Sequence, residues 1–337
     1  MSILIGILGL ALLMVIHEGG HLLAARAFGM RVIRFSIGFG PALWRYQPKG
    51  SETVYQLALI PFLAYVQIAG MNPYEEIDPE DKGSYANASL IGRISAIFAG
   101  PLANYLFASV LFLAAFTIGG DTTTVQIMEG GAAEAAGLKD GDKVVSIDGR
   151  PIKGWDDIPD AVLPKAKVPI PVVIKRDGKE QSFTITPEPK AKNGQGQIGV
   201  RPTSMVPALD FKEAAVESVL HPAKVVRALV IGLGRIITGK ERPEVTGPVG
   251  IVKETSRAAE RGPADYLYLL GLLSAYLGGF NLLPFPALDG GRLMFLGYEA
   301  VTRRRPNARI EAHVHAVGLL MLLALIAVIS VFDIRGK

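Results

Sequence analysis

Long apolar runs divide the sequence into segments that match the thickness of a lipid bilayer. Residues 2–27 are almost uniformly apolar, and at a rise of about 1.5 Å per residue a helix of this length crosses a hydrocarbon core of about 30 Å. Comparable runs occupy residues 91–118 and 312–332, and another occupies 266–283 with a continuation over 292–301. The pattern predicts a multi-pass α-helical membrane protein with about four transmembrane helices.

Two further segments show the short alternating runs that are typical of strands. Residues 122–202 are charged and rich in turn residues, which predicts one extracytoplasmic β-rich domain. Residues 31–71 alternate around several glycines and prolines, but they are too apolar for a free loop. Because open sheet edges are tolerated within a membrane only where they line a cavity, we interpret 31–71 as a membrane-associated, partly re-entrant β-hairpin.

The linker after the β-rich segment has a third kind of pattern. Apolar residues in 211–237 recur at helical spacing around charged ones, which indicates an amphipathic helix on the membrane face. An ordinary connector helix fits the same pattern equally well. The expected division of the chain is therefore 1–120 for the first membrane part, 121–202 for the β-rich domain, 203–265 for linker helices and 266–337 for the second membrane part.

Composition narrows the class of protein further. The chain has 337 residues, half of them apolar, which is unlike a small soluble domain. It contains no cysteine, so disulfides and thiolate metal sites are excluded and any metal must use histidine or carboxylate ligands. The net charge of +4 is spread along the chain without interleaved aromatic residues. This distribution gives no support for nucleic-acid binding and suits a lipid bilayer with anionic headgroups.

Positive charges near the spans predict how the chain is oriented. Residues 303–305 are all arginine and lie in the short connection before the last apolar run, so we place this connection in the cytoplasm. With four crossings, both termini and residues 122–202 then lie on the opposite side. A cleaved signal peptide is the alternative for residues 2–27. However, no basic residue precedes this run, and the run carries His17, Glu18 and His21, where a signal peptide would be featureless.

His17-Glu18-Gly19-Gly20-His21 matches the pattern H-E-x-x-H. On a helix, histidines at i and i+4 face the same side, a geometry that suits tetrahedral zinc. Glu18 lies about 100° around the helix from His17, where its carboxylate can reach a metal-bound water as general base. The alternative is that these are incidental polar residues. Ionisable groups are costly in hydrocarbon and usually face a functional cavity, so we interpret the motif as a metal site.

A catalytic zinc site needs a third protein ligand, and Asp289 is the candidate within the membrane. It follows Pro284 and Pro286 and precedes Gly290 and Gly291, so it lies at a break in the third predicted span. Broken intramembrane helices usually line functional cavities. Alternatively, Asp289 caps the helix that starts near Gly290. The other histidines are expected at the surface, in interfacial or loop positions: His221, His313 and His315.

Three motifs in the apolar segments resemble the signature elements of the site-2 protease family of intramembrane metalloproteases. They are HEGGH at 17–21, AGPLAN at 99–104 and NLLPFPALDGG at 281–291. The resemblance covers nearly the whole chain. It implies Zn²⁺ as cofactor, with the metal centre formed by His17, His21 and Asp289 as ligands and Glu18 as the catalytic residue. It also implies substrate contacts from Asn281, Pro284 and Pro286, and from Ala64, Tyr65 and Val66 in the hairpin.

The hairpin and the β-rich segment extend the resemblance. Residues 35–41 and 61–71 resemble the family's membrane-associated β-region, whose edge strand pairs with an unwound substrate. A transmembrane helix hides its scissile carbonyls in its own hydrogen bonds, so local unfolding is required and β-addition can hold the extended form. Residues 124–200 resemble a PDZ domain, through GGAAEAAGLKDGD at 130–142 and VVSIDG at 144–149. The best-known Gram-negative members have two such domains in tandem, whereas this sequence predicts one.

The implied function is hydrolysis of peptide bonds within or near the spans of single-span membrane proteins, such as anti-sigma factors or signal-peptide remnants, in the bacterial cytoplasmic membrane. Whether the PDZ-like groove binds a peptide is left open. Two other classes fit parts of the pattern. A membrane scaffold would use the PDZ-like domain without a metal, and a metal transporter would line its path with the same histidines and aspartate. The glutamate of H-E-x-x-H favours the protease, because it is specific to water activation.

Overall fold

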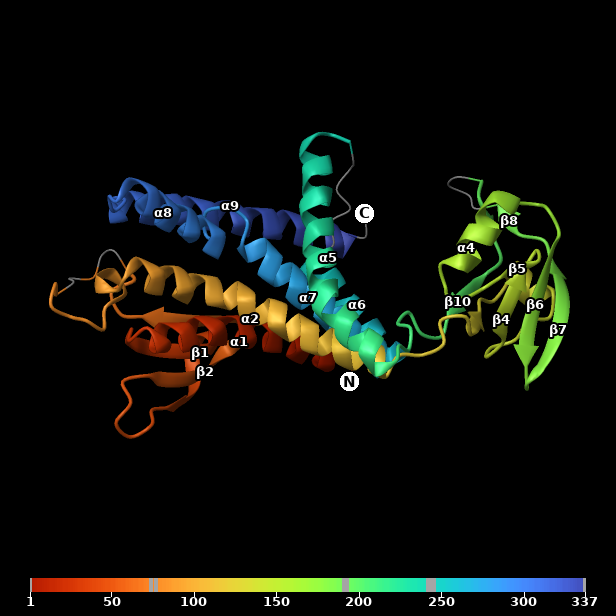
Figure 1. Ribbon diagram of the computed structural model, residues 1–337, viewed down its shortest axis with the longest axis horizontal. Coiled ribbons are helices and arrows are strands. Elements are labelled where there is room, and N and C mark those ends of the chain that lie inside the picture. The colour runs from red at the N-terminus through yellow and green to blue at the C-terminus, as the bar shows by residue number, and fades with distance from the viewer. Residues whose placement is uncertain (1, 73–74, 76–77, 190–193, 241–246, 336–337) are drawn as a thin grey trace. The chain divides into compact units, whose positions relative to one another are not determined.

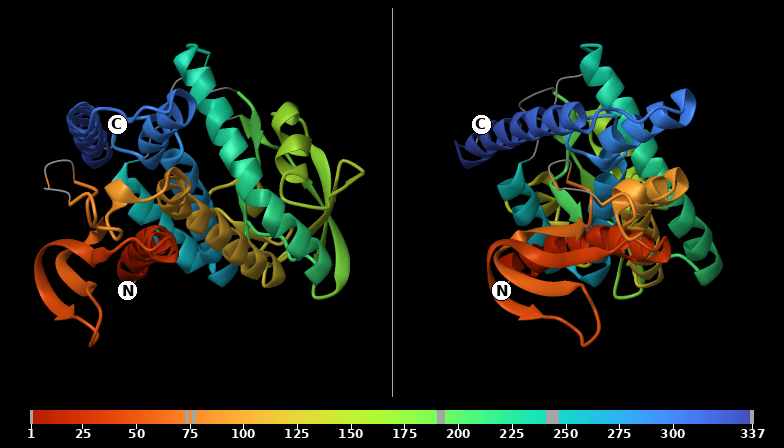
Figure 2. Two further views of the ribbon diagram at one scale, coloured as in Figure 1. Left: turned by 60° about the vertical axis from the view of Figure 1, so that its left-hand side comes forward. Right: turned by 90° about the vertical axis from the view of Figure 1, so that its left-hand side faces the viewer.

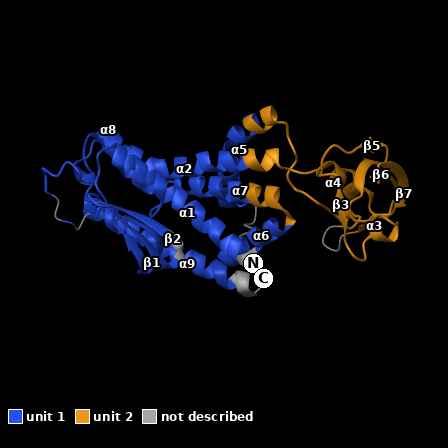
Figure 3. Cartoon of the chain, turned by 90° about the horizontal axis from the view of Figure 1, so that it is seen from below, with its two compact units in different colours: residues 1–112, 216–260, 269–337 blue, residues 113–215, 261–268 orange. Residues whose placement is uncertain are grey.

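The computed structural model describes residues 2–72, 75, 78–189, 194–240 and 247–335. It divides into two compact units (Figure 3). The first unit comprises Met1–Phe112, Val216–Glu260 and Leu269–Lys337, and the second comprises Leu113–Ala215 and Arg261–Tyr268. The second unit contains the segment that the sequence predicts to be β-rich, and the first contains most of the predicted membrane parts.

Helices form most of the first unit (Figure 1). Among the described residues, three helical stretches are long and apolar enough to cross a bilayer: Leu4–Ala27, Leu90–Thr117 and Ala308–Val331. They belong to α1 (Ser2–Ala27), α2 (Leu90–Thr117) and α9 (Ala308–Arg335), which confirms the first, second and fourth predicted apolar helices. The remaining long helices are α5 (Phe211–Ile237), α6 (Pro248–Arg261), α7 (Pro263–Asn281) and α8 (Asp289–Thr302).

The third predicted crossing is divided between two helices. α7 ends at Asn281 and α8 begins at Asp289, and neither is among the stretches that are long and apolar enough to cross a bilayer alone. Pro284 and Pro286 lie in the turn between them, and proline cannot supply the backbone N–H that a continuous helix needs. The predicted break at Asp289 is therefore confirmed, whereas the count of four crossings stays a prediction.

Glycines on α1 and α2 allow these two helices to lie side by side at short distance (Figures 1 and 2). A Cβ added at Gly20 of α1 would lie 2.2 Å from the Ala99 carbonyl oxygen. A Cβ added at Gly100 of α2 would lie 2.3 Å from Nε2 of His21. Small residues at such crossings let helix backbones approach closely in membranes. HEGGH and AGPLAN therefore contribute to helix packing as well as to the predicted site.

The predicted hairpin is present as β1 (Val32–Tyr46) and β2 (Val54–Ile68), which pair antiparallel. Residues 34–37 of β1 have partners on both sides, in 54–57 and in 64–67 of β2. Residues 64–67 therefore lie at an edge of this small sheet, and β2 packs against α1. An edge strand leaves main-chain N–H and C=O groups unpaired on one side, where another extended chain can bind.

The hairpin also exposes many apolar side chains. Gly38 and Gly40, with φ angles of 94° and 93°, bend β1, and the hairpin projects away from the helices in Figure 2. Its exposed large apolar residues are Phe39, Leu43, Trp44, Tyr46, Leu57, Leu59 and Ile60. Apolar surface of this extent is unusual on a soluble protein and fits the membrane association predicted for this segment.

The second unit contains the β-rich domain. A sheet of order β5-β4-β6-β7 is formed by β4 (Lys143–Ile147), β5 (Arg150–Pro151), β6 (Ile170–Arg176) and β7 (Lys179–Ile185). Two smaller sheets pair β3 (Val125–Ile127) with β10 (Val200–Pro202) and β8 (Glu188–Pro189) with β9 (Gly196–Gln197), and the short helices are α3 (Ala132–Ala135) and α4 (Asp157–Val162). The domain has its own apolar core, which includes Val125, Val144, Ile147, Val172 and Ile174.

A buried ion pair stabilises the turn before β4. Arg176 donates to both carboxylate oxygens of Asp142 at 2.7 Å, and the Lys139 amide donates to the same carboxylate at 2.8 Å. Burial alone would raise the pKa of Asp142, but the hydrogen bonds from Arg176 and the Lys139 amide outweigh burial and hold this pKa below its usual value. The ion pair therefore stabilises the domain while Asp142 is ionised.

Candidate metal centre

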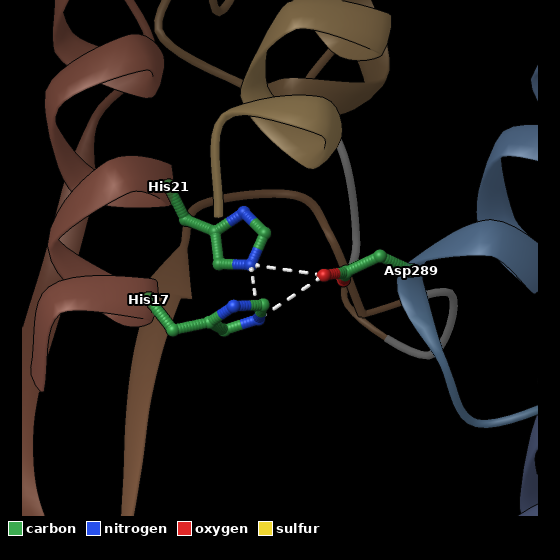
Figure 4. A group of neighbouring side chains, drawn as sticks. All are labelled: His17, His21 and Asp289. Atoms are coloured by element: carbon green, nitrogen blue, oxygen red, sulfur yellow. Dashed lines mark hydrogen bonds and ion pairs between the residues drawn. The ribbon is translucent and has the colours of Figure 1, made fainter. Parts of the chain in front are cut away.

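Three side chains from distant parts of the sequence converge in the first unit (Figure 4). His17 and His21 project from one face of α1, and Asp289 projects from the first residue of α8. Oδ2 of Asp289 lies 3.1 Å from Nε2 of His17 and 3.3 Å from Nε2 of His21, and the two Nε2 atoms are 3.2 Å apart. Both histidines are buried. The structure therefore brings together the three residues that the sequence predicts as ligands.

Helix α2 holds the other ring nitrogen of each histidine. Nδ1 of His21 donates to the Ala96 carbonyl at 2.8 Å, which leaves Nε2 unprotonated and directed at the cluster. The Asn104 amide lies 3.1 Å from Nδ1 of His17, and its Oδ1 is buried with no partner among the described residues. The two orientations of an amide have the same shape. Rotating it places Oδ1 against Nδ1–H of His17, so that both Nε2 atoms present lone pairs to the cluster.

The donor set fits a zinc ion. Two unprotonated imidazole nitrogens and a carboxylate oxygen face one another, and no described residue donates a hydrogen bond to Oδ2 of Asp289. A buried carboxylate oxygen without a donor is destabilising, and three electron-pair donors at this distance repel one another unless a cation lies between them. Two histidines and one carboxylate leave a fourth tetrahedral position open, which is typical of catalytic rather than structural zinc.

Glu18 lies next to the cluster and contacts the hairpin. Its Oε2 accepts a hydrogen bond of 3.0 Å from the Val66 amide. Val66 lies in the part of β2 that forms an edge of the hairpin sheet, directly after Ala64 and Tyr65. The HEGGH motif and the hairpin edge therefore meet directly at the glutamate. No motif or periodicity in the sequence relates Glu18 to Val66, because this contact joins residues 48 positions apart.

The end of α7 and the loop that follows it carry the predicted site residues that precede Asp289. Asn281 is the last residue of α7, and its amide donates to a carbonyl one turn back in the helix at 2.9 Å. Pro284 and Pro286 follow in the loop. The N-cap of α8 is Leu288, and Asp289 is the first helical residue. The alternative in which Asp289 caps this helix is therefore wrong, and its carboxylate is available to face the histidines.

Comparison with known proteins identifies the family. The profile of Peptidase family M50 matches residues 5–325. The chain belongs to peptidase family M50. It is 32% identical to the zinc metalloprotease RasP of Geobacillus kaustophilus, over 95% of this chain and 94% of the relative. It is 34% identical to a Fusobacterium nucleatum protein, over 99% and 98% of the two chains, and 30% identical to a Clostridium acetobutylicum protein, over 99% and 97%; both relatives are named provisionally as zinc metalloproteases.

Membership of the family confirms the class of enzyme. This M50 peptidase is a zinc metalloprotease, and its long apolar helices make it a membrane protein. The resemblance to site-2 proteases that the three motifs carry is confirmed, and zinc is the cofactor. The metal, the enzyme class and the His-His-Asp cluster therefore agree with one another.

Two histidines of this M50 peptidase occupy positions that the sequence did not indicate. His315 lies in α9, half-buried, and its Nδ1 accepts a hydrogen bond of 2.9 Å from the Ala287 amide. His221 lies in α5, half-buried, with its ring packed edge-on against Phe112 at 4.5 Å between centroids. The expectation that both lie at the surface is wrong, because helical periodicity does not show which side chains another segment covers. His313 is exposed, as predicted.

Proposed function

We propose that this M50 peptidase hydrolyses peptide bonds within or near the spans of single-span membrane proteins. The observation that carries the proposal is the location of the His17, His21 and Asp289 cluster. Two of its three side chains belong to α1, a helix with the length and apolarity of a bilayer crossing. A hydrolytic centre on such a helix acts at membrane depth. Peptide bonds at this depth belong to transmembrane segments, which are therefore the substrate class that the location favours.

We assign His17, His21 and Asp289 as the zinc ligands and Glu18 as the general base. A zinc ion held by these residues supplies Lewis-acid polarisation and lowers the pKa of a bound water toward neutrality. The Glu18 carboxylate accepts the proton of the attacking water and passes it to the nitrogen of the departing amine. Its hydrogen bond to the Val66 amide supports this role, because it holds the carboxylate beside the cluster.

We assign substrate binding to the edge of the hairpin. Each carbonyl of a transmembrane helix is bonded within that helix, so the substrate must be locally unwound before it is cut. The edge at residues 64–67 lies beside Glu18, which accepts the Val66 N–H, and β-addition to the other main-chain groups of this edge would hold an unwound substrate extended. The residues assigned to substrate contact are Ala64, Tyr65 and Val66 on this edge, and Asn281, Pro284 and Pro286 ahead of the aspartate ligand.

We place the peptidase in the bacterial cytoplasmic membrane, with α7 and α8 together completing a third of four crossings. Arg305 donates to the Ala86 carbonyl at 2.7 Å, so the connection before α9 and the segment before α2 meet at one end of the first unit. The arginines of the connection before α9 predict that it is cytoplasmic, and with four crossings the segment before α2 lies on the same side of the membrane. The β-rich domain is then extracytoplasmic.

We interpret residues 124–200 as a PDZ-like domain that selects substrates mainly by size. Its separate apolar core supports a folded module, which cannot enter the bilayer and would exclude substrates with bulky outer domains. Binding of a peptide in its groove, which residues 197–200 would border, is then secondary. Deleting 124–200 and bridging the gap with a flexible linker should allow cleavage of untrimmed substrates while trimmed ones are still cut. An unchanged ratio of the two rates would favour a recruiting role.

Glu18→Gln tests the proposed function. The amide keeps the shape of the side chain but cannot take a proton, so the variant should bind zinc and cut no single-span substrate. Comparing the membrane proteomes of cells with the wild-type enzyme and with the variant should show uncut substrates accumulating. Glu188→Gln, in the exposed strand β8, is the matched control.

Each other outcome has a defined meaning. Cleavage by Glu18→Gln at the wild-type rate would place the general base elsewhere. Loss of zinc from this variant would make Glu18 a ligand. A metal-free scaffold or a metal transporter would give no accumulation of uncut membrane proteins, so an unchanged proteome would contradict the protease assignment of these residues.

A further inference from the structure

Helix α9 holds the loop that precedes Asp289. His315 Nδ1 accepts the hydrogen bond of the Ala287 amide at 2.9 Å. One turn further along α9, a Cβ added at Gly318 would lie 2.3 Å from Cβ of Pro286, so this loop packs directly on the backbone of α9. Helix α9 therefore contacts two consecutive residues of the loop: its backbone at Gly318 packs against Pro286, and its His315 side chain accepts the hydrogen bond of Ala287.

The backbone at Ala287 needs such support. Ala287 has a φ of 76°, in the left-handed region that residues with a Cβ rarely adopt. A conformation of this kind persists only where the surrounding structure imposes it. Ala287 is two residues before Asp289, so the direction in which the chain leaves Ala287 determines where α8 begins and where the aspartate carboxylate points.

We propose that His315 is a positioning residue for Asp289. Nδ1 of His315 accepts the Ala287 N–H, keeps Ala287 in its left-handed conformation and thereby aims the carboxylate at His17 and His21. The proposal rests on the assignment of Asp289 as a zinc ligand. It requires an acceptor at the place of Nδ1, with the ring proton on Nε2.

The His315 ring also makes packing contacts, which must be separated from its hydrogen bond. The His315 ring also lies beside Phe295, at 5.8 Å between centroids, and 3.3 Å separates its Cε1 from a Cβ placed at Gly291. An apolar side chain of similar size would reproduce these packing contacts. It would leave the Ala287 N–H without its acceptor, so the nitrogen atom is the feature to test.

Three substitutions separate the acceptor from the packing. In His315→Asn the side-chain oxygen lies close to the place of Nδ1, in His315→Gln it lies close to that of Nε2, and His315→Leu has no acceptor. Zinc affinity is measured on the purified full-length chain by competition with a chelator, and thermal unfolding of the zinc-free chain is measured in parallel. We expect His315→Leu and His315→Gln to lose about 10–100-fold in zinc affinity, and His315→Asn to recover most of it.

A second measurement probes the accessibility of the loop in the zinc-free protein. The chain has no cysteine, so Leu288→Cys introduces a single thiol in the loop. In the zinc-free protein, Leu288→Cys combined with His315→Leu should react with maleimide faster than Leu288→Cys alone. Combined with His315→Asn, it should react at the rate of Leu288→Cys alone. A rise with all three substitutions alike would show that packing alone holds the loop, and would overturn the proposal.

The zinc titrations also separate this proposal from the ligand assignment. Asp289→Ala is measured alongside. If Asp289→Ala retains zinc, the assigned ligand set is wrong. If Asp289→Ala loses zinc while His315→Leu binds it as tightly as the wild type, the ligand set stands and the positioning role of His315 is wrong. If His315→Leu does not fold, the comparison of His315→Asn with His315→Gln decides, and equal affinities in these two would contradict the role.

Discussion

Gly20→Ala tests how closely α1 must approach α2 for the metal centre to form. The two glycines of HEGGH are adjacent, but their surroundings differ. A Cβ at Gly20 would lie 2.2 Å from the Ala99 carbonyl oxygen, whereas a Cβ at Gly19 would have no heavy atom within 4 Å. Since ordinary contacts of a Cβ begin at 3.4 Å, the backbone of α2 must retreat by roughly 1 Å to admit a methyl group at Gly20.

This retreat acts on the metal centre because α2 orients both histidines. His21 Nδ1 is 2.8 Å from the Ala96 carbonyl, and His17 Nδ1 is 3.1 Å from the Asn104 amide. An added separation of about 1 Å takes both beyond hydrogen-bond distance. Overpacking should cost about 1–3 kcal/mol of folding free energy. Loss of the two contacts should lower zinc affinity about 10–100-fold, and displaced ligands should slow cleavage by at least about 100-fold.

The assay compares Gly20→Ala with Gly19→Ala in the same motif. Zinc affinity, thermal unfolding and cleavage of a single-span substrate in detergent are measured for each. Gly19→Ala should stay within about twofold of the wild type, because its methyl group enters open space and alanine is favourable in a helix. Wild-type zinc affinity and cleavage in Gly20→Ala would show that the close approach of α1 and α2 does not hold the histidines in place. Equal losses in the two variants would show that helix packing does not explain the glycines.

Further substitutions test three sets of contacts, two in the first unit and one in the β-rich domain. Asn104→Leu should raise the zinc dissociation constant about 10–100-fold in a chelator competition, and an unchanged constant would remove the amide from the support of His17. Arg93 and Glu299 form a bidentate ion pair with side chains 8% and 11% exposed. Neutralising either residue alone should destabilise the fold by about 3–5 kcal/mol, because it leaves a buried charge without its partner, and neutralising both should cost less than the sum. Additive losses in thermal melts would contradict this coupling. The pKa of Asp142 is lower in the folded domain than in the unfolded chain, so its ion pair stabilises the domain above about pH 4, and this contribution is lost as pH falls through the folded pKa. Asp142→Asn should therefore flatten the pH dependence of domain unfolding. An unchanged acid transition in this variant would contradict a stabilising role for the ion pair.

Local patterns in the sequence predicted most of the secondary structure. Uniform apolar runs identified α1, α2 and α9, because a span must be apolar along its whole length. Alternation with turn residues identified the β1–β2 hairpin and the β-rich domain, and helical spacing gave α5 with its observed bounds, Phe211–Ile237. These features depend on residues close together in the sequence, so a single chain is sufficient to predict them.

Part of the metal cluster can also be predicted from local sequence. His17 and His21 are one helical turn apart, and helix geometry alone places their rings together. Asp289 was predicted from the break that two prolines make in an apolar run. Its distance to the histidines depends on how α8 packs against α1, which no local pattern contains.

The remaining contacts are long-range and were not predictable. His17 meets Asn104 at a separation of 87 residues, and Ala287 meets His315 at a separation of 28. The sequence showed His315 only as a polar residue near the start of an apolar run. Its role depends on which loop packs on α9, and that is decided by tertiary structure rather than by periodicity.

The proposed function depends on His17, His21 and Asp289 as the ligands of the catalytic zinc in the first unit. The most direct measurement is the zinc content of the purified protein and of Asp289→Ala and His17→Ala, with thermal unfolding to confirm that the variants fold. We predict one zinc per chain in the wild type and none in the two variants after mild chelation. A full equivalent of zinc in folded Asp289→Ala would contradict the assignment of Asp289 as a ligand.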